Sequence, residues 1–212
     1  MLKQRWIETA RLMSVLQGRE PQRLSLPGFR ESAVLVPLLV SGDPVKGNLA
    51  VLEDPQVLFI VRTDTLPTHA GQVAFPGGKK EAQDQSLEHT ALRESYEELA
   101  IPHDRVKVFG ALDDIPTPFQ FTITPFVGLL NADVPLVPDP GEVAETFTMP
   151  LFDLPSLYRE GPPIEWRGRR YKMHDFAHPK HRIWGATAVM LLQLLFLLGL
   201  SDIDGSRHET VP

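Results

Sequence analysis

Three glutamates near the middle of the chain have the spacing of a metal-binding helix. Glu94, Glu97 and Glu98 are related as i, i+3 and i+4, so on an α-helix their carboxylates share one face. Like charges at this spacing repel, and no Lys or Arg lies four residues beyond any of them. Divalent cations such as Mg²⁺ take oxygen ligands from carboxylates, waters and substrate phosphates. The spacing therefore indicates either a metal site or a solvated acidic helix face.

The segments before these glutamates favour the metal site. Residues 73–76 read as a short strand, and Gly77-Gly78 predicts a turn because glycine adopts backbone conformations that other residues avoid. The polar residues 79–86 predict a loop in which Asp84 or Ser86 caps the helix. The helix is expected to place apolar residues opposite the glutamates, namely Leu92, Tyr96 and Leu99. A strand, a glycine turn and an acidic helix in this order are typical of a metal and phosphate site.

This segment resembles the Nudix box of the Nudix hydrolases. In that motif a Gly is followed by a Glu, and then by Arg-Glu-x-x-Glu-Glu-x-Gly and an apolar residue. Here Asp84 replaces the first Glu, one extra residue separates it from Arg93, Ser95 occupies a usually apolar position, and Ala100 replaces the last Gly. The resemblance is strong, with these four departures from the general pattern.

A second motif lies upstream. Residues 58–63, Leu-Phe-Ile-Val-Arg-Thr, and residues 69–78, His-Ala-Gly-Gln-Val-Ala-Phe-Pro-Gly-Gly, resemble the extended signature of the coenzyme A pyrophosphatase branch. That branch has the same longer spacing before Arg93. Weaker matches at 142–145 and 183–188 extend the resemblance over most of the chain from about Ala33.

The resemblance implies a fold and a set of site residues. The fold is an α/β structure, a Nudix-type α/β/α sandwich with a mixed sheet. The length of the chain independently predicts a single domain over residues 1–212. The cofactor is Mg²⁺ or Mn²⁺, with the ligands Glu94, Glu97, Glu98 and the Gly77 carbonyl. The catalytic residues are the same three glutamates and Arg93, which orients them by ion pairing. The candidate substrate-binding residues are Arg62, His69, Gly78 and Lys79. Arg62 closes the run 57–61, where its guanidinium either reaches a phosphate or forms a surface ion pair, whereas His69 is a candidate mainly because of the resemblance.

The resemblance also implies the reaction. Coenzyme A or a derivative is cleaved at its pyrophosphate, giving 3′,5′-ADP and 4′-phosphopantetheine or its acyl form. One Glu, with Glu97 and Glu98 favoured, takes the proton of the attacking water. The alternatives are another Nudix activity on ADP-ribose, nucleoside diphosphate sugars, dinucleotides or nucleoside triphosphates, a non-catalytic Nudix-like binding module, and a structural protein with an acidic helix.

Other charged residues leave alternatives open. Glu142 or Glu145 is a candidate for a further carboxylate opposite the helix, as a late loop Glu is in other Nudix enzymes. Asp113 and Asp114 are either further ligands or part of a solvated turn. The basic segment 167–182 either holds a distal nucleotide phosphate through Arg or is a solvated hairpin.

Composition limits the classes of protein that fit. A formal charge of −6 argues against broad nucleic-acid binding, which depends on Lys and Arg. The absence of Cys and of a signal-like N-terminus favours the cytoplasm. Residues 183–200 are almost wholly apolar, but they are short for a bilayer core of ~30 Å and are interrupted by polar residues and glycines. We expect a buried C-terminal helix rather than a membrane span, and its apolar surface is compatible with a homodimer contact.

The remaining elements follow from local patterns. The expected helices are an N-terminal helix within 6–16, followed by an irregular connector to residue 32, and a short helix within 151–158. The expected strands are 33–40, 57–61, 106–112, 121–130 and an extended run at 142–147, with a hairpin at 164–171. Residues 201–212 are expected to form a mobile tail.

Overall fold

The computed structural model describes residues 5–64, 69–166, 169–205 and 210–211. Its α-helices are α1 (Thr9–Gln17), α2 (Leu87–Leu99), α3 (Leu154–Leu157) and α4 (Gly185–Leu197), and a 3₁₀ turn spans His103–Arg105. The strands are β1 (Trp6–Glu8), β2 (Arg30–Val40), β3 (Val51–Glu53), β4 (Gln56–Arg62), β5 (Val73–Ala74), β6 (Gly77–Lys79), β7 (Val106–Ala111), β8 (Ile115–Pro116), β9 (Phe121–Asn131), β10 (Val143–Pro150), β11 (Tyr158–Trp166), β12 (Arg169–Ala177), β13 (Arg182–Trp184) and β14 (Thr210–Val211).

A mixed sheet forms the middle layer. Its order is β10-β4-β2-β9-β7, with β5, β6 and β8 added to β4, β2 and β9. β2 runs parallel to β9 from Arg30↔Phe121 to Val40↔Asn131, and the other pairs are antiparallel. The central parts of these strands, residues 33–40 of β2 and 57–61 of β4, are continuous apolar runs because both faces of the sheet are covered there.

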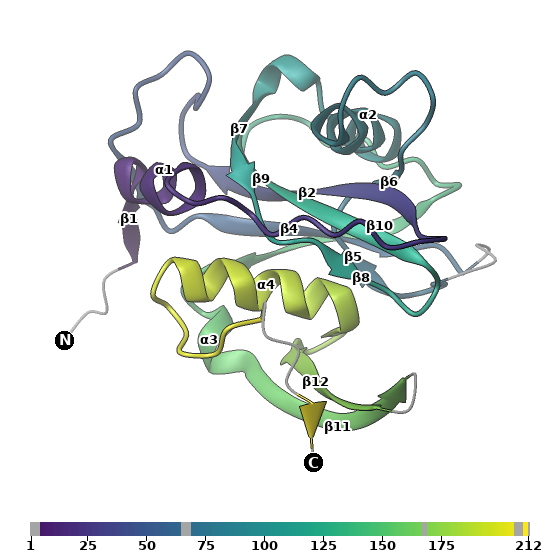
Figure 1. Ribbon diagram of the computed structural model, residues 1–212. Coiled ribbons are helices and arrows are strands. Elements are labelled where there is room, and N and C mark those ends of the chain that lie inside the picture. Colours follow the sequence, from purple (N-terminus) through teal and green to yellow (C-terminus); the bar gives the residue numbers. More distant parts are fainter. Residues whose placement is uncertain (1–4, 65–68, 167–168, 206–209, 212) are drawn as a thin grey trace.

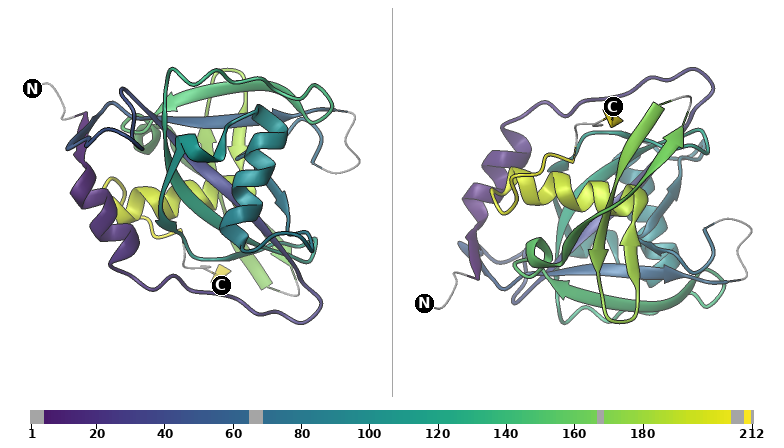
Figure 2. Two further views of the ribbon diagram at one scale, coloured as in Figure 1. Left: turned by 90° about the horizontal axis from the view of Figure 1, so that it is seen from above. Right: turned by 90° about the horizontal axis from the view of Figure 1, so that it is seen from below.

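The two faces of the sheet carry different helices. α2 lies over one face and α4 over the other, as the views from above and below show (Figures 1 and 2). Leu35, Leu58 and Leu99 belong to the core under α2, whereas Phe59, Val127 and Leu191 belong to the core on the α4 side. Alternate residues of one strand therefore enter opposite cores, as the pleat requires. The predicted α/β/α sandwich with a mixed sheet is confirmed.

The C-terminal apolar run forms a buried helix. Eight of the thirteen residues of α4 are buried. Within the described residues, no helix combines the length and apolar character needed to cross a membrane. The predicted hairpin is present, since β11 pairs antiparallel with β12. In the tail, residues 201–205 and β14 are described, and β14 pairs with β12, while residues 206–209 and 212 lie outside the described residues.

The N-terminal prediction is wrong in its first residues. Residues 6–8 form β1, which pairs with β3, and the helix begins only at Thr9. Helical spacing alone does not exclude this outcome, because pairing with a distant strand overrides a local pattern. The connector behind α1 is fixed rather than loose, since two buried aspartates hold it.

Those aspartates are Asp113 and Asp114, which the sequence left open as ligands or as a solvated turn. Both readings are wrong. Asp113 accepts a hydrogen bond from the Gln22 N–H at 2.8 Å and pairs with Arg19. Asp114 pairs with Arg23 at 2.8 Å. Both aspartates are buried, and their carboxylates bind the connector to the sheet.

Candidate active site

The acidic helix begins and ends with distinct caps. Ser86 is the N-cap, and its side chain accepts a hydrogen bond from the His89 N–H at 3.0 Å. At the other end Ala100 adopts the left-handed conformation, with φ 56° and ψ 30°, and its N–H donates to Tyr96 at 2.8 Å. This is the position where the Nudix pattern has Gly, which adopts that conformation without a steric cost.

Replacing Ala100 with Gly is therefore expected to stabilise the protein. Relief of the left-handed strain outweighs the greater freedom of Gly in the unfolded chain, leaving a gain of about 0.5–1 kcal/mol. Urea unfolding at constant m-value measures this gain. Ala91→Gly inside the same helix is the control and is expected to lose about 1 kcal/mol or more. A loss of stability in Ala100→Gly would show that the conformation carries no strain.

Glu98 is the most buried of the three glutamates, with 1% of its side chain exposed. Its Oε2 accepts a hydrogen bond from the Gly77 N–H at 2.9 Å. Its Oε1 lies 3.5 Å from Arg62 Nη1, and within the described chain Oε1 is buried without a hydrogen-bond partner. Burial raises the pKa of Glu98 to about 8, and the Gly77 N–H and Arg62 only partly oppose this shift.

Gly77 and Gly78 form part of strand β6 rather than a free turn, which corrects the prediction made from the sequence. β6 pairs antiparallel with residues 32–34 of β2. Gly77 has φ 153°, and a Cβ atom there would lie 2.4 Å from the Ala33 carbonyl oxygen. Glycine is required at this position because β6 lies directly against β2, and this placement aims the Gly77 N–H at Glu98.

Glu94 packs against the second glycine. A Cβ atom at Gly78 would lie 2.4 Å from Glu94 Cδ, so a side chain at this position would displace the Glu94 carboxylate. The side chain of Glu94 is 15% exposed, and burial raises its pKa, with Arg93 opposing the shift. The charge of Glu94 also raises the pKa of Glu98, as a nearby carboxylate does. The strand β6 therefore brings these two carboxylates together.

Glu97 has a different environment from Glu94 and Glu98. Its side chain is 51% exposed and is bound by Arg93, whose Nη1 lies 2.8 Å from Oε2. The predicted division into an acidic and an apolar face is wrong, because Glu98 and Ser95 are buried and Tyr96 is 55% exposed. Adjacent helical residues differ by about 100° in direction, so Glu97 and Glu98 diverge.

Arg93 organises the outer side of the site. Its Nη2 lies 3.0 Å from Glu94 Oε1, and Arg93 contacts Glu97 as well, which is the orienting geometry that the resemblance implied. Its main anchor is Asp84, which accepts from Arg93 Nε at 2.9 Å and from Nη2 at 3.1 Å. Thr90 also donates to Asp84, at 2.9 Å. The guanidinium holds the pKa of the buried Asp84 carboxyl far below its usual range.

The substrate-binding candidates are divided by the structure. Gly78 and Arg62 lie against the glutamates. His69 is exposed, with φ 60°, and its Nδ1 lies 2.8 Å from Gln72 Oε1. The exposed Lys79 places its ammonium 5.8 Å from the Phe121 ring centroid. Among the residues that the structure describes, no hydrogen bond or ion pair joins the side chains of His69 or Lys79 to the glutamates of α2.

The two late glutamates lie in different surroundings. Glu142 precedes β10, where its carbonyl accepts from the Thr63 N–H at 3.0 Å, and its charge raises the pKa of both Glu94 and Glu98. Glu145 instead pairs with Lys180 and lies 3.4 Å from His181 Nε2. Glu142 is therefore the late carboxylate close to the acidic helix.

The basic segment is largely neutralised. Lys180 is bound by Glu145, and Arg182 lies 2.7 Å from Asp175. Arg167 lies outside the described residues. These ion pairs favour a surface hairpin over an unpaired phosphate site.

The oxygens of these carboxylates are chemically suitable ligands for a hard divalent cation, but their present positions do not form a metal site. Glu98 has a buried oxygen without a hydrogen-bond partner, and Glu94 and Glu142 lie near it. In the described parts of the chain, however, no three acidic or imidazole side chains converge closely enough to hold a metal ion. Glu97 is 51% exposed and pairs with Arg93 through Oε2.

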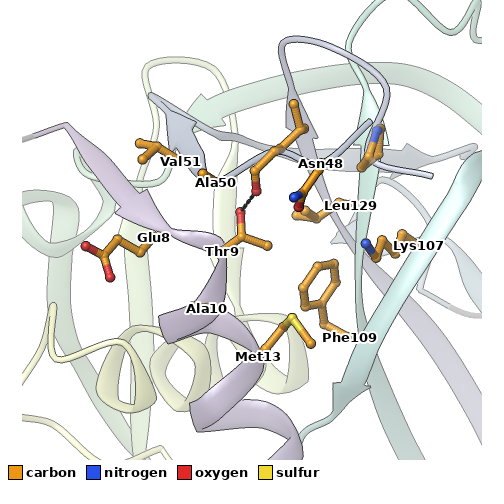
Figure 3. A pocket seen from close by; sticks show the side chains of 12 residues that line it. Glu8, Thr9, Ala10, Met13, Asn48, Ala50, Val51, Lys107, Phe109 and Leu129 are labelled. Atoms are coloured by element: carbon orange, nitrogen blue, oxygen red, sulfur yellow. Dashed lines mark hydrogen bonds between the residues drawn. The ribbon is translucent and has the colours of Figure 1, made fainter. Parts of the chain in front are cut away.

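A pocket of about 410 Å³ lies away from these residues. Met13, Lys107, Phe109 and Leu129 line it, between α1, the loop before β3, and strands β7 and β9 (Figure 3). Phe109 and Leu129 belong to the core on the α4 side of the sheet, whereas the glutamates are on the α2 side. We therefore assign no part of the chemistry to this pocket.

Comparison with known proteins defines the class. The NUDIX domain family matches residues 44–171. The uncharacterized Nudix hydrolase NudL of Photorhabdus laumondii is 38% identical over 178 residues, covering 82% of this chain and 87% of that relative. The protein of the same name from Pectobacterium atrosepticum is 39% identical over 174 residues, covering 82% and 84%. The chain belongs to the Nudix hydrolase family and is a Nudix pyrophosphohydrolase.

The comparison with solved structures gives a weaker similarity than the comparison of sequences. The crystal structure of a Nudix hydrolase from M. smegmatis, RenU, matches with a TM-score of 0.46 at 17% identity, over 61% of this chain and 75% of that chain. Family membership therefore rests on the domain match and on the two relatives.

Proposed function

We propose that this chain hydrolyses the pyrophosphate linkage of coenzyme A or its derivatives, giving 3′,5′-ADP and 4′-phosphopantetheine or its acyl form, with Mg²⁺ or Mn²⁺. One observation carries the catalytic part of the proposal. The Glu98 carboxylate is buried, with one oxygen held by the Gly77 N–H and the other without a hydrogen-bond partner in the described chain. Burying a charge in this way is costly unless it is paired or bound to a metal. Such a group is typical of a catalytic centre.

The residues of the chain have separate roles in this reaction. Glu94, Glu97 and Glu98, with the Gly77 carbonyl, would hold the cation, and Glu142 would add negative charge beside them. When bound, the cation neutralises the phosphates and acidifies a water. Arg93 keeps Glu94 and Glu97 oriented, and Glu97 or Glu98 accepts the proton of that water.

The residues that we propose to contact the substrate form a separate group. Arg62 lies next to Glu98 and provides a guanidinium suited to phosphate. Gly78 lies against the Glu94 carboxylate. His69 and Lys79 lie farther out and would contact the remainder of the nucleotide. Support for coenzyme A comes from the motifs at 58–63 and 69–78, since the names of the relatives give no substrate.

Product identification tests this proposal. The purified protein is incubated with Mg²⁺ and, separately, with coenzyme A, ADP-ribose, a nucleoside diphosphate sugar, a dinucleotide and a nucleoside triphosphate, and the products are identified by mass spectrometry. We expect 3′,5′-ADP from coenzyme A at a rate at least about tenfold above the other substrates. Survival of coenzyme A while ADP-ribose is consumed would refute the substrate and leave the family assignment intact.

A further inference from the structure

The ion pair between Arg62 and Glu98 is unusually incomplete. The 3.5 Å between Arg62 Nη1 and Glu98 Oε1 is at the limit of a hydrogen bond. Within the described chain, Arg62 Nε and Glu98 Oε1 are both buried without a hydrogen-bond partner. The nearby pair of Arg93 and Asp84 has two contacts of 2.9 and 3.1 Å. The Arg93–Asp84 pair therefore has the geometry of a permanent structural contact, whereas the Arg62–Glu98 pair does not.

The backbone of Arg62 is fixed while its side chain is not. Its N–H donates to the Gln72 carbonyl and its carbonyl accepts from the Gly71 N–H, both at 3.0 Å. Its strand neighbour across the β4–β10 ladder is Val143. The side chain is 21% exposed, so the guanidinium lies at the boundary between the buried carboxylate and solvent. Side-chain rotation alone can therefore move the guanidinium away from Glu98.

Electrostatics favours that movement when the site is loaded. A divalent cation bound by Glu98 would bring a second positive charge close to the Arg62 guanidinium, and like charges repel strongly in a partly buried site. A released guanidinium presents donors that match phosphate oxygens in a bidentate contact. Repulsion by the cation and attraction to phosphate therefore both act on the side chain of Arg62.

We infer that Arg62 is a temporary partner of the Glu98 carboxyl group, which a divalent cation replaces, and that the released guanidinium then binds a phosphate of the nucleoside diphosphate substrate. This inference rests on the proposed function and adds to it a coupling between cation binding and nucleotide binding. Arg62 contributes little to nucleotide binding before the cation enters, and much afterwards. Binding of the cation and of the nucleotide therefore strengthen each other through Arg62.

The test is a binding cycle that requires no turnover. Isothermal titration calorimetry measures the affinity for α,β-methylene-ADP, whose phosphorus-carbon bridge resists hydrolysis, with and without Mn²⁺, after correction for the Mn²⁺–nucleotide complex in solution. The variants are Arg62→Gln, Arg62→Lys and the control Arg182→Gln, which removes an Arg from a surface ion pair with Asp175. We expect Arg62→Gln to lose about tenfold in nucleotide affinity with Mn²⁺ and less than about twofold without it. Arg62→Lys keeps the charge without the planar guanidinium and loses less, and Arg182→Gln behaves as the wild type.

Equal losses of affinity with and without Mn²⁺ would overturn the inference, because Arg62 would then bind the nucleotide independently of the cation. Should Arg62→Gln fail to fold, the folded Arg62→Lys protein carries the test, and equal losses of affinity with and without Mn²⁺ in that variant overturn the inference as well. The proposed function fails differently: the wild-type protein would then bind Mn²⁺ and the nucleotide without any mutual strengthening.

Discussion

Replacing Glu98 with Gln is expected to lower the Mg²⁺-dependent hydrolysis rate by about 10³-fold. The substitution keeps the shape of the side chain and removes the charge that would hold the cation. Gln also offers no base to the attacking water. Steady-state kinetics at saturating Mg²⁺ measures the loss. Glu88→Gln is the matched control, because Glu88 is on the exposed side of the first turn of α2, and its rate is expected to equal that of the wild type.

The same substitution is expected to stabilise the metal-free protein at high pH. Burial raises the pKa of Glu98 to about 8, so the folded protein holds this proton more tightly than the unfolded chain does. The resulting stability is fully present below the unfolded pKa near 4.5 and is lost as the pH rises through about 8. At about pH 9, urea unfolding should therefore show Glu98→Gln to be more stable by ~3–5 kcal/mol. A turnover within tenfold of the wild type, or equal stabilities at that pH, would contradict the role assigned to Glu98.

Replacing Asp84 with Asn is expected to cost about 3 kcal/mol of the free energy of unfolding at neutral pH. Asp84 is fully buried as a side chain and accepts from Arg93, Thr90 and the Glu81 N–H. Asn loses the charge and turns two donors toward the Arg93 guanidinium, which stays partly buried without its main partner. Turnover should fall as well, because Arg93 then orients Glu94 and Glu97 less firmly. Urea unfolding and steady-state kinetics measure the two effects.

The control for Asp84 is Asp54→Asn, which removes an exposed partner of Arg5. Surface ion pairs of this kind contribute about 0–1 kcal/mol. The difference between the two variants should shrink in acid, since the lowered pKa of Asp84 makes its contribution present above its unfolded pKa near 3.8 and lost as the pH falls. A loss below about 1 kcal/mol in Asp84→Asn would show that Arg93 has another anchor.

Local patterns in the sequence predicted the elements that carry the site. Ser86 at the start of α2, the apolar runs of β2, β4 and β9, and the hairpin of β11 and β12 are all present as expected. Each is encoded by signals within a few residues, such as a capping side chain or a run of β-branched residues. The branch of the family and the roles of the site residues come from motif resemblance and remain predictions.

Contacts between residues that are far apart in the chain could not be predicted from the sequence. Asp84 was considered as a helix cap, whereas the structure uses it as the anchor of Arg93, nine residues away along the chain. Asp113 and Asp114 bind a connector that is distant in sequence. The burial of Glu98 depends on β6 lying against β2, which no local pattern indicates. Helical spacing showed that the three glutamates are neighbours, but not that Glu98 faces the sheet and Glu97 faces solvent.

The dependence of hydrolysis on a divalent cation tests the central claim most directly, and heavy oxygen in the products shows that water is the attacking group. Chelator-treated enzyme is incubated with coenzyme A in water enriched in oxygen-18, and the products are weighed by mass spectrometry before and after Mg²⁺ is added. We expect no products before the addition, and afterwards 3′,5′-ADP and 4′-phosphopantetheine with a single heavy oxygen on one of the two new phosphate groups. Equal product formation in the presence of the chelator would contradict an active centre built from the carboxylates of α2 and a divalent cation.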